Sequence, residues 1–522
     1  MLKTALYPRH RTLVLLVALV ILALVARLLP GPRTIDDAFI TFRYSRNLVE
    51  GQGFVYNPGE RVLGTTTPLF TLLMAAVSLL TGQQDYQWYA IGVSAVADSA
   101  TVVLLFLLVR RLTQNEWAGA LLGGLWAISP MSVTFAVGGM ETSVNILWMV
   151  SAAWCFVNGR DGWLGVFAAL GLLTRVDSLI WVGLLWLFQF IERLATTTGR
   201  PLAARFPWRT WLACAVVLSP WLVFSLSYFG SPVPRSLAAK GLAYMMPPGS
   251  ALQRLIQFYA TPFFEFDAFG PMGAIAGLVV YTALNGIGML FAARRLPRLL
   301  PFLFYPWLYL AVFSVANPLI FRWYLAPPMP ALMLGVLAGG WALIESLHKA
   351  TENGWVPRVA LGALTVMWGG LSLNAWELHP DHGLDRPAPV MAWNKVELLY
   401  QDMAMQLVEE YGVTPDMEVA AGDIGTIGYF TRARILDTVG LVTPQVEHYY
   451  PISPDLIVPG QNYAIPPQLI ADTRPPYLVV MEAAVRLGVE RDPTFQADYL
   501  LLREIPTDFY GTGMRLYRRV HQ

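Results

Sequence analysis

Charge is scarce in this sequence. Only 14% of its 522 residues are Asp, Glu, Lys or Arg, whereas about a quarter is usual for a soluble domain. Hydrophobic residues make up 55%, so the shortage of charge excludes an ordinary soluble protein and indicates a chain that crosses a membrane several times. The net charge is only +1 and no basic face is evident, which argues against nucleic acid as a partner.

Cysteine is also rare, and the motifs of soluble enzymes are missing. Cys155 and Cys214 lie in separate apolar runs, so we expect no disulfide between them. The chain has no P-loop, no nucleophile elbow and no cysteine pair with zinc spacing. Two histidines and two aspartates at 379–385 lie in a proline-rich linker, a context that does not favour a metal site. We therefore predict no cofactor, with a divalent metal requirement left as an alternative.

Apolar runs long enough to span a membrane, or nearly so, fill most of the first 374 residues. A helix needs about 20 apolar residues to cross a bilayer core. The eleven runs lie at 12–30, 88–110, 117–136, 142–158, 162–174, 179–192, 210–228, 270–292, 300–316, 325–346 and 357–374. The first is longer than the ~7–15 residues of a signal peptide's apolar core, so we expect a retained helix with its N-terminus inside.

A further apolar run, at 68–80, is too short to span, and we expect it to lie on the outer surface. With that arrangement the basic clusters all fall on the inner side, as short cytoplasmic loops prefer. These clusters are Arg110-Arg111, Arg160, Arg193 to Arg209, Arg294 to Arg298, and Lys349 with Arg358. The sequence therefore predicts a transmembrane module at 1–374, with surface helices in a first outer loop at about 34–82.

Residues 375–522 are richer in charge and proline and contain no spanning run. Met417–Ala421 and Tyr477–Met481 have the composition of strands, and Val396–Tyr411 has the pattern of an amphipathic helix. We predict that this region forms one extracytoplasmic α/β domain.

The most informative stretch is 34–44, which follows the first span. Two adjacent carboxylates, Asp36 and Asp37, begin an amphipathic helix at the membrane edge. At about 100° per residue, Arg43 shares the face of Asp36, while Asp37 points further outward. Acids at a membrane edge with cations one and two turns away suit an enzyme that takes a sugar from a lipid phosphate. The alternative is that one of the two acids only caps the helix.

Polar residues at other outer turns are candidates for the same site, because polar groups at membrane depth are costly and usually functional. Arg175 could bind a phosphate, or it could only contact Asp177 within its own turn. Glu141 could contact a substrate, or it could cap the helix that follows.

Five more residues, at three places in the sequence, each allow two interpretations. Arg235 and Lys240 begin a long outer loop and could hold a lipid phosphate, or their side chains could snorkel to head groups. Arg322 and Tyr324 open the tenth span, where an aromatic belt is expected in any case, yet an arginine between aromatics also suits a phosphate. Asp423 lies in a glycine-rich turn after a predicted strand. A structural turn is one interpretation, and a nucleotide-binding turn is the other, although the spacing is not the dinucleotide pattern.

Several blocks of sequence resemble the GT-C glycosyltransferases, most closely the mycobacterial terminal arabinofuranosyltransferases and their bacterial relatives. The specific block is Asp-Asp-Ala-Phe-Ile-Thr-Phe-Arg-Tyr, followed by the segments 47–53 and 56–62. Weaker blocks lie at 65–70, 139–142, 174–177 and 422–425. The resemblance implies a polytopic fold with a catalytic acid in the first outer loop and a polyprenyl-monophosphate sugar as donor. The acid maps to Asp36 or Asp37. Leu63 and Val176 depart from the family pattern, which leaves the sugar open.

The residues and the resemblance together predict an inverting glycosyltransferase of the bacterial inner membrane, with a cytoplasmic N-terminus and the C-terminal domain outside. It would move a sugar, with arabinofuranose as one candidate, from a polyprenyl phosphate to a glycan or other hydroxyl acceptor. The predicted ligands of the donor phosphate are Arg43, Arg175, Arg235, Lys240 and Arg322. The predicted substrate contacts are Glu141, Asp177, Tyr324 and Asp423. A flippase for a lipid-linked sugar and a non-catalytic glycolipid-binding protein remain as alternatives.

Overall fold

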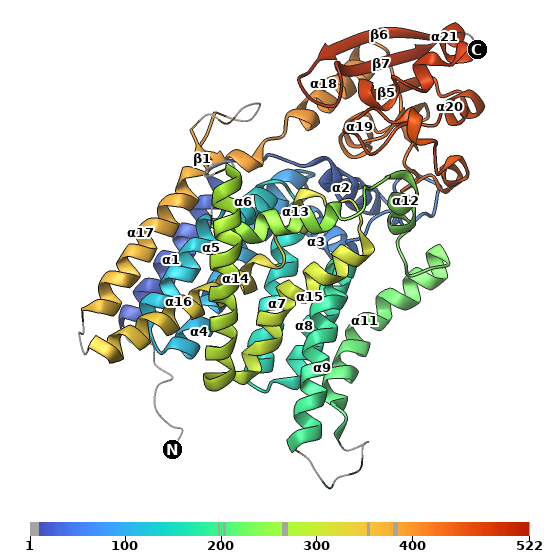
Figure 1. The fold of residues 1–522 in the computed structure, drawn as a ribbon. Coiled ribbons are helices and arrows are strands. Elements are labelled where there is room, and N and C mark those ends of the chain that lie inside the picture. The colour runs from blue at the N-terminus through green and yellow to red at the C-terminus, as the bar shows by residue number, and fades with distance from the viewer. Residues whose placement is uncertain are drawn as a thin grey trace. The chain divides into compact units, whose positions relative to one another are not determined.

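The computed structural model describes residues 10–196, 199, 201, 205–263, 270–351, 355–378, 380 and 385–520 (Figure 1). The chain divides into two compact units. The first, called the helical unit below, comprises Met1–Arg33, Ala90–Pro220 and Gly249–Trp393. The second, the mixed unit, comprises Thr34–Tyr89, Trp221–Pro248 and Asn394–Gln522. Of the histidines and aspartates at 379–385, only Asp385 lies within the described residues.

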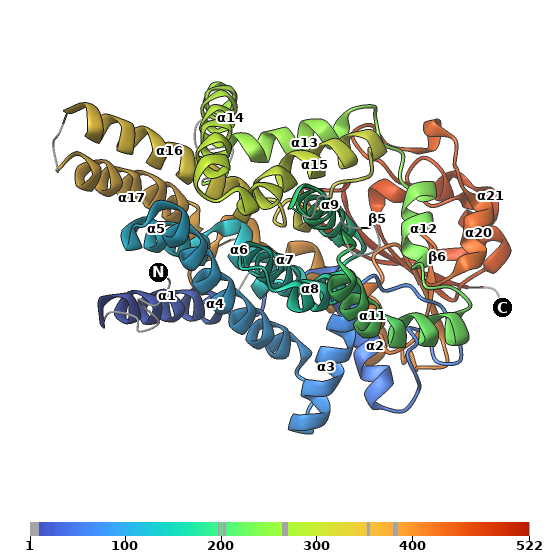
Figure 2. The same cartoon turned by 90° about the horizontal axis from the view of Figure 1, so that it is seen from below.

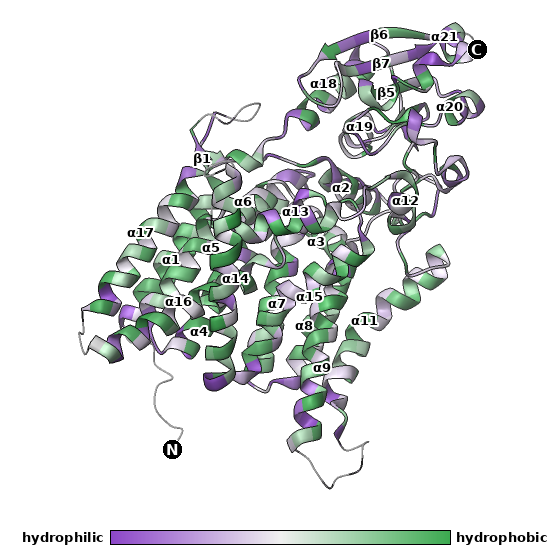
Figure 3. Ribbon diagram, in the orientation of Figure 1, coloured by the Kyte–Doolittle hydropathy of each residue, from purple (hydrophilic) through white to green (hydrophobic). Residues whose placement is uncertain are grey.

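Long apolar helices dominate the chain, and Figure 3 shows hydrophobic residues along most of their length. Within the described ranges, eight helical segments are long and apolar enough to cross a membrane, and the bent pair α5–α6 makes a ninth. The eight are α1 (His10–Leu28), α4 (Tyr86–Thr113), η1 with α9 (Val176–Thr196), α11 (Trp208–Phe229), α14 (Gly270–Arg295), η3 with α15 (Pro297–Ala316), α16 (Met329–Thr351) and α17 (Val356–Asn374). The shorter apolar helices α7 (Thr142–Val157) and α8 (Asp161–Thr174) complete the set of eleven predicted runs, and the predicted polytopic helical fold is confirmed.

Proline and glycine shape the helical unit at two places. Helices α5 (Glu116–Ile128) and α6 (Pro130–Val137) meet at 43°, where Pro130 cannot donate a backbone hydrogen bond to the preceding turn. Helices α14 and α16 pack closely (Figure 1, Figure 2), and a Cβ on Gly339 would lie 1.9 Å from the Leu284 carbonyl oxygen. Gly335, one turn earlier in α16, also lies against α14. Small residues at such a contact let two membrane helices approach each other closely.

An ion pair is buried among the helices of this unit. Arg27 of α1 and Asp98 of α4 are both 0% exposed, and Arg27 Nε donates to Asp98 Oδ2 at 2.9 Å. Ser143 of α7 donates to the same oxygen at 2.9 Å, and the guanidinium also donates to the Ser132 hydroxyl of α6. Four helices thus share one polar cluster in an otherwise apolar interior, where charges are retained only when paired.

The other elements of the helical unit are short. They are α13 (Ser250–Ala260), the turn η4 (Arg322–Tyr324), and an antiparallel pair of strands, β1 (Trp376–Glu377) and β2 (Ala388–Pro389), with η5 (Val390–Ala392) after them.

The mixed unit contains a five-stranded sheet in the order β4-β3-β5-β7-β6. Strands β3 (Glu418–Ala421), β4 (Arg434–Asp437) and β5 (Tyr477–Met481) are parallel, while β6 (Tyr499–Pro506) and β7 (Gly513–Arg519) pair antiparallel. The helices are α18 (Lys395–Glu409), α19 (Gly425–Thr431), α20 (Pro467–Thr473) and α21 (Pro493–Asp498). Both predicted strands and the predicted amphipathic helix are present, so the α/β character of this region is confirmed.

The same unit includes segments from far earlier in the chain: α2 (Asp36–Val49), α3 (Pro68–Thr81) and α12 (Arg235–Ala243). Buried polar contacts tie α2 and the loop after it to the sheet. Asn57 exchanges two hydrogen bonds of 3.0 Å with the backbone of Ile435 in β4. The compact unit therefore includes residues well before 375, because the segment Thr34–Tyr89 folds together with the C-terminal residues rather than standing alone.

Candidate active site

The two adjacent aspartates of α2 have different surroundings. Asp36 is buried, and its carboxylate accepts hydrogen bonds from the backbone N–H groups of Gly425 (2.9 Å) and Thr426 (2.7 Å). Those donors are the first turn of α19, so Asp36 occupies the N-terminus of a helix that lies 389 and 390 positions away in sequence. The acid does not cap its own helix, whose N-cap is Ile35 without a side-chain hydrogen bond.

Gly425 explains part of the glycine-rich turn. A Cβ at this position would lie 1.8 Å from the Asp36 carbonyl oxygen, so only glycine lets α19 approach the start of α2 this closely. The backbone N–H groups at the start of α19, which a phosphate would need in the nucleotide-binding interpretation, donate instead to the side chain of Asp36. The geometry agrees with the structural interpretation of the turn.

The proton affinity of Asp36 also follows from its position. Burial, followed by the nearby charge of Asp423, raises the pKa of Asp36 to about 8, although the hydrogen bond from the Thr426 N–H opposes both effects. At neutral pH this acid therefore favours its protonated form. An acid that already carries its proton is poorly suited to act as the general base.

Asp37 is the more solvent-exposed of the two aspartates. Its side chain is 29% exposed and accepts a hydrogen bond of 3.2 Å from Lys240 Nζ of α12. One carboxylate oxygen, Oδ2, takes part in this contact. An open carboxylate beside a lysine is the arrangement expected of a proton acceptor next to an anion ligand.

Asp423 lies two residues after β3 and belongs to the same neighbourhood. Its carboxylate accepts a hydrogen bond of 2.9 Å from the Tyr400 hydroxyl of α18, and the residue is exposed. Desolvation by the surrounding protein raises the pKa of Asp423, the Tyr400 hydrogen bond opposes this, and the charge of Asp37 adds to it. Ligands of open α/β sheets commonly bind outside the carboxyl ends of parallel strands, which is where Asp423 lies.

Arg43, the cation that shares a helix face with Asp36, is buried, and its three guanidinium nitrogens all donate hydrogen bonds. Only 1% of it is exposed, and it donates to the carbonyl oxygens of Gly428 (2.6 Å), Ala433 (2.7 Å) and Tyr56 (2.8 Å). Its guanidinium also stacks on the Tyr56 ring at 4.2 Å. These contacts favour a structural role for Arg43, which holds α2 on the sheet.

Arg235, at the start of α12, is exposed and forms an ion pair of 2.9 Å with Glu447. Its backbone N–H donates to the Leu63 carbonyl at 2.9 Å. The residue therefore fixes the start of α12, and Lys240 follows slightly more than one turn later.

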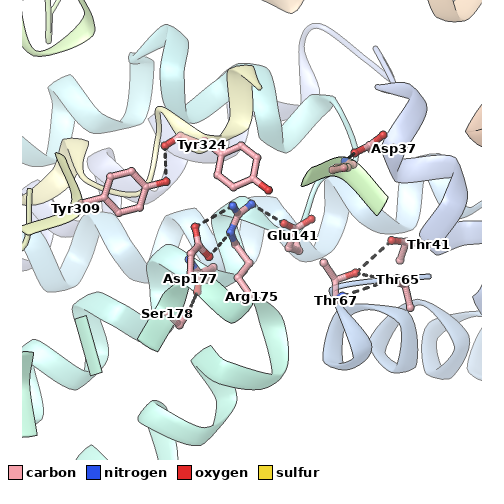
Figure 4. A network of polar contacts seen from close by, with 12 residues as sticks. Asp37, Thr41, Thr65, Thr67, Glu141, Arg175, Asp177, Ser178, Tyr309 and Tyr324 are labelled. Atoms are coloured by element: carbon pink, nitrogen blue, oxygen red, sulfur yellow. Dashed lines mark hydrogen bonds and ion pairs between the residues drawn. The ribbon is translucent and has the colours of Figure 1, made fainter. Parts of the chain in front are cut away.

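In the helical unit, Arg175 lies between two carboxylates (Figure 4). Its Nε and Nη2 form a bidentate pair with Asp177 at 2.9 and 3.0 Å, and Nη1 donates to Glu141 at 2.7 Å. The guanidinium lies 4.9 Å from the centre of the Tyr324 ring. The predicted contact between Arg175 and Asp177 is present, and so the fork of donors that a phosphate would need is filled by carboxylates.

The charges of this network follow from that geometry. Burial raises the pKa of Glu141, and the adjacent Arg175 opposes the rise. Burial disfavours the charge of Arg175, but Asp177 and Glu141 outweigh it and raise the pKa of Arg175 well above its ordinary value. Glu141 stands at the N-cap position of α7 but makes no capping hydrogen bond, because its carboxylate pairs with Arg175.

The remaining candidates of this unit, Arg322 and Tyr324, both lie in η4. Arg322 donates to the Met391 carbonyl at 2.9 Å and stacks on Trp393 at 4.6 Å. The carbonyl oxygen of Tyr324 accepts a hydrogen bond of 2.8 Å from Tyr309, which orients the turn. Within the described ranges, no three His, Cys, Asp or Glu side chains gather as metal ligands would.

Sequence reasoning missed several tyrosines. Tyr400, Tyr244 and Tyr463 all lie within electrostatic reach of Asp423, and Tyr244 also lies within reach of Asp37. Tyr244 follows α12, and Tyr463 lies between β4 and β5, so no local pattern connects the two. Their only signal in the sequence is a high aromatic content, which membrane anchoring also explains.

Comparisons with known proteins agree with this fold. A family model described as a domain of unknown function (DUF8728) matches residues 391–518. Two terminal β-(1→2)-arabinofuranosyltransferases, from Corynebacterium glutamicum and Mycobacterium tuberculosis, are each 28% identical over 231 and 226 residues. These matches cover 39% and 40% of this chain, and only 32% and 35% of the two relatives.

The same architecture occurs in solved structures of ArnT from Cupriavidus metallidurans. The structure bound to undecaprenyl phosphate has a TM-score of 0.57 at 14% identity, with 99% of both chains covered. The apo structure has a TM-score of 0.59 at 14% identity, with 97% of this chain and 98% of that one covered. The chain is a multi-pass membrane protein with the GT-C fold.

Proposed function

We propose that this protein is an inverting glycosyltransferase that moves a sugar from a polyprenyl-phosphate donor to a hydroxyl group of a glycan. The fold supports this class, because a neighbour with the same architecture is bound to undecaprenyl phosphate. The 28% identical relatives, named as arabinofuranosyltransferases, make arabinofuranose the first sugar to test. We further propose that the N-terminus is cytoplasmic and that the chemistry takes place on the outer side of the bacterial inner membrane.

The observation that carries the proposal is the pair formed by Asp37 and Lys240, with Asp36 withdrawn into the N-terminus of α19. In the reaction, the acceptor oxygen attacks the anomeric carbon while its proton passes to Asp37. The bond between that carbon and the phosphate oxygen breaks, and polyprenyl phosphate leaves with the electron pair. Lys240 stabilises the charge that develops on the leaving phosphate. A single displacement of this kind inverts the anomeric centre.

The other predicted phosphate ligands are less suited in this geometry. Arg43 is saturated by carbonyl oxygens, and Arg175 by carboxylates. Arg235 and Arg322 stay predictions as phosphate ligands, and so do Glu141, Asp177 and Tyr324 as substrate contacts. We propose that no organic cofactor takes part, and chelation by EDTA tests whether a divalent metal does.

The test is transfer by the purified full-length protein in lipid nanodiscs. The donor is decaprenyl-phosphoryl-arabinofuranose, and a parallel panel carries mannose, glucose, galactose or aminoarabinose on the same lipid. The acceptor is a synthetic arabinofuranosyl oligosaccharide, and mass spectrometry and NMR identify the product and its anomeric configuration. We expect an extended glycan with inverted configuration.

The matched variants are Asp37→Asn and Asp416→Asn. Asp37→Asn should reduce the transfer rate roughly 10²–10⁴-fold, the usual contribution of a general base. Asp416 is an exposed aspartate before β3, at the opposite end of that strand from Asp423, and Asp416→Asn should leave the rate unchanged. Intact donor after incubation with every lipid of the panel would refute a transferase and favour a flippase or a binding protein.

A further inference from the structure

Two tyrosine rings form a corner at the carboxyl ends of the parallel strands of the mixed unit. The ring centres of Tyr244 and Tyr463 are 5.7 Å apart, and the ring planes meet at 57°. Both side chains are partly exposed. The corner adjoins Thr438, the first residue after β4, whose hydroxyl lies 2.6 Å from that of Tyr463. This is the side of an open α/β sheet where ligands bind.

The corner is held in place from both sides. The backbone N–H of Met245, next to Tyr244, donates to the carbonyl of Asn462, next to Tyr463, at 2.9 Å. The segment is fixed again at the start of α12 by the ion pair between Arg235 and Glu447. A pre-positioned pair of aromatic rings presents a large contact surface at little cost in conformational entropy.

Acidic and hydroxyl groups surround the corner. Asp423 is exposed and follows Gly422, where a Cβ would lie 3.5 Å from the Tyr463 side chain. It accepts a hydrogen bond of 2.9 Å from the Tyr400 hydroxyl. The pKa of Tyr244 is raised well above its ordinary value, chiefly by burial and then by the charges of Asp423 and Asp37 together with Tyr463. Tyr244 therefore keeps its proton and can donate or accept hydrogen bonds.

This chemistry selects a neutral polyol rather than a phosphate. Asp423, the exposed acid beside the corner, repels an anion. A sugar ring offers an apolar C–H face to an aromatic ring and donates its hydroxyls to carboxylates. Resting on the proposed function, we propose that Tyr244, Tyr463 and Asp423 form the subsite of the acceptor sugar and bring its reacting hydroxyl to Asp37.

The experiment compares two substitutions at Tyr244 in the full-length protein in nanodiscs. Tyr244→Leu removes the aromatic face and Tyr244→Phe keeps it, and Tyr449→Leu is the matched control because Tyr449 lies in the same unit, hydrogen-bonded to Asp472 at its surface. The KM for the arabinofuranosyl oligosaccharide should rise roughly tenfold in Tyr244→Leu, since an aromatic contact contributes about this much. Tyr244→Phe should restore most of the wild-type KM.

Donor readouts separate this role from a structural one. The KM for decaprenyl-phosphoryl-arabinofuranose should stay at the wild-type value in all three variants, while only the KM for the acceptor changes. An acceptor KM in Tyr244→Leu equal to that of the wild type would overturn the subsite. A joint rise of the donor and acceptor KM values with a lowered melting temperature would also overturn it, because it indicates a packing role.

A binding measurement keeps the subsite testable if the proposed transfer fails. Saturation-transfer NMR with the same oligosaccharide should detect contact with the wild-type protein and Tyr244→Phe, and a weakened signal with Tyr244→Leu. Binding without turnover would contradict the proposed function and leave the subsite supported. Equal signals from all variants, or none from the wild type, would refute the subsite.

Discussion

The two adjacent aspartates of α2 should respond in opposite ways to the same substitution. In Asp36→Asn, the amide can accept only one of the two N–H groups at the start of α19, and its own N–H₂ faces the other. A stranded buried donor costs about 1–3 kcal/mol. In Asp37→Asn, one partly exposed ion pair is lost, which costs roughly 0–1 kcal/mol.

Activity should show the reverse order. Asp37→Asn removes the proposed proton acceptor, so transfer should fall roughly 10²–10⁴-fold although the protein stays nearly as stable as the wild type. Asp36→Asn should lower the melting temperature by a few degrees for each kcal/mol, and the folded fraction should retain most of its transfer rate. Tryptophan fluorescence during heating and the nanodisc transfer assay measure the two quantities on the same samples.

The two variants should thus differ in opposite directions, with the larger loss of stability in Asp36→Asn and the larger loss of transfer in Asp37→Asn. A loss of transfer in Asp36→Asn as large as that in Asp37→Asn, with an unchanged melting temperature, would refute the division of roles. Equal losses of stability in both variants would show that Asp37 is also structural. Asp416→Asn serves as the control in both measurements, because its exposed carboxylate accepts a hydrogen bond from the nearby Thr414 hydroxyl and lies at the other end of β3 from Asp423.

Three further predictions concern stability. Arg27→Met should destabilise the helical unit by about 3–5 kcal/mol because it leaves Asp98 buried without its cation, and the double variant Arg27→Met/Asp98→Leu should recover most of that loss in a denaturant titration. Gly425→Ala should lower the melting temperature, since its Cβ would meet the Asp36 carbonyl, whereas Gly241→Ala, with nothing within 4 Å in α12, should be neutral or stabilising by roughly 0.5–1 kcal/mol. The fold raises the pKa of Asp36 from its ordinary value of 3.8 to about 8. The contribution of Asp36 to the free energy of unfolding is therefore fully present below that ordinary value and is lost as the pH rises to 8. The melting temperature of the wild type should therefore fall between pH 5 and 8, and this fall should be smaller in Asp36→Asn.

Local pattern was sufficient for most of the secondary structure. The spanning helices follow from long apolar runs, because every backbone group in a bilayer must be satisfied within its own segment. Strands β3 and β5 and helix α18 follow from composition and periodicity over a few residues. The bend between α5 and α6 could also have been expected from Pro130, but the apolar run is continuous there and we predicted one span.

The sequence by itself determined that this protein is a polytopic membrane protein with a charged C-terminal domain and an acid pair at the end of its first span. Only the tertiary structure decided which acid is buried, that Arg43 holds α2 on the sheet, and that Tyr244 meets Tyr463. The physical reason is that these roles depend on partners up to 390 residues away. Burial and hydrogen bonding by such partners leave no periodicity in the sequence, so two neighbouring aspartates look alike until the chain is folded.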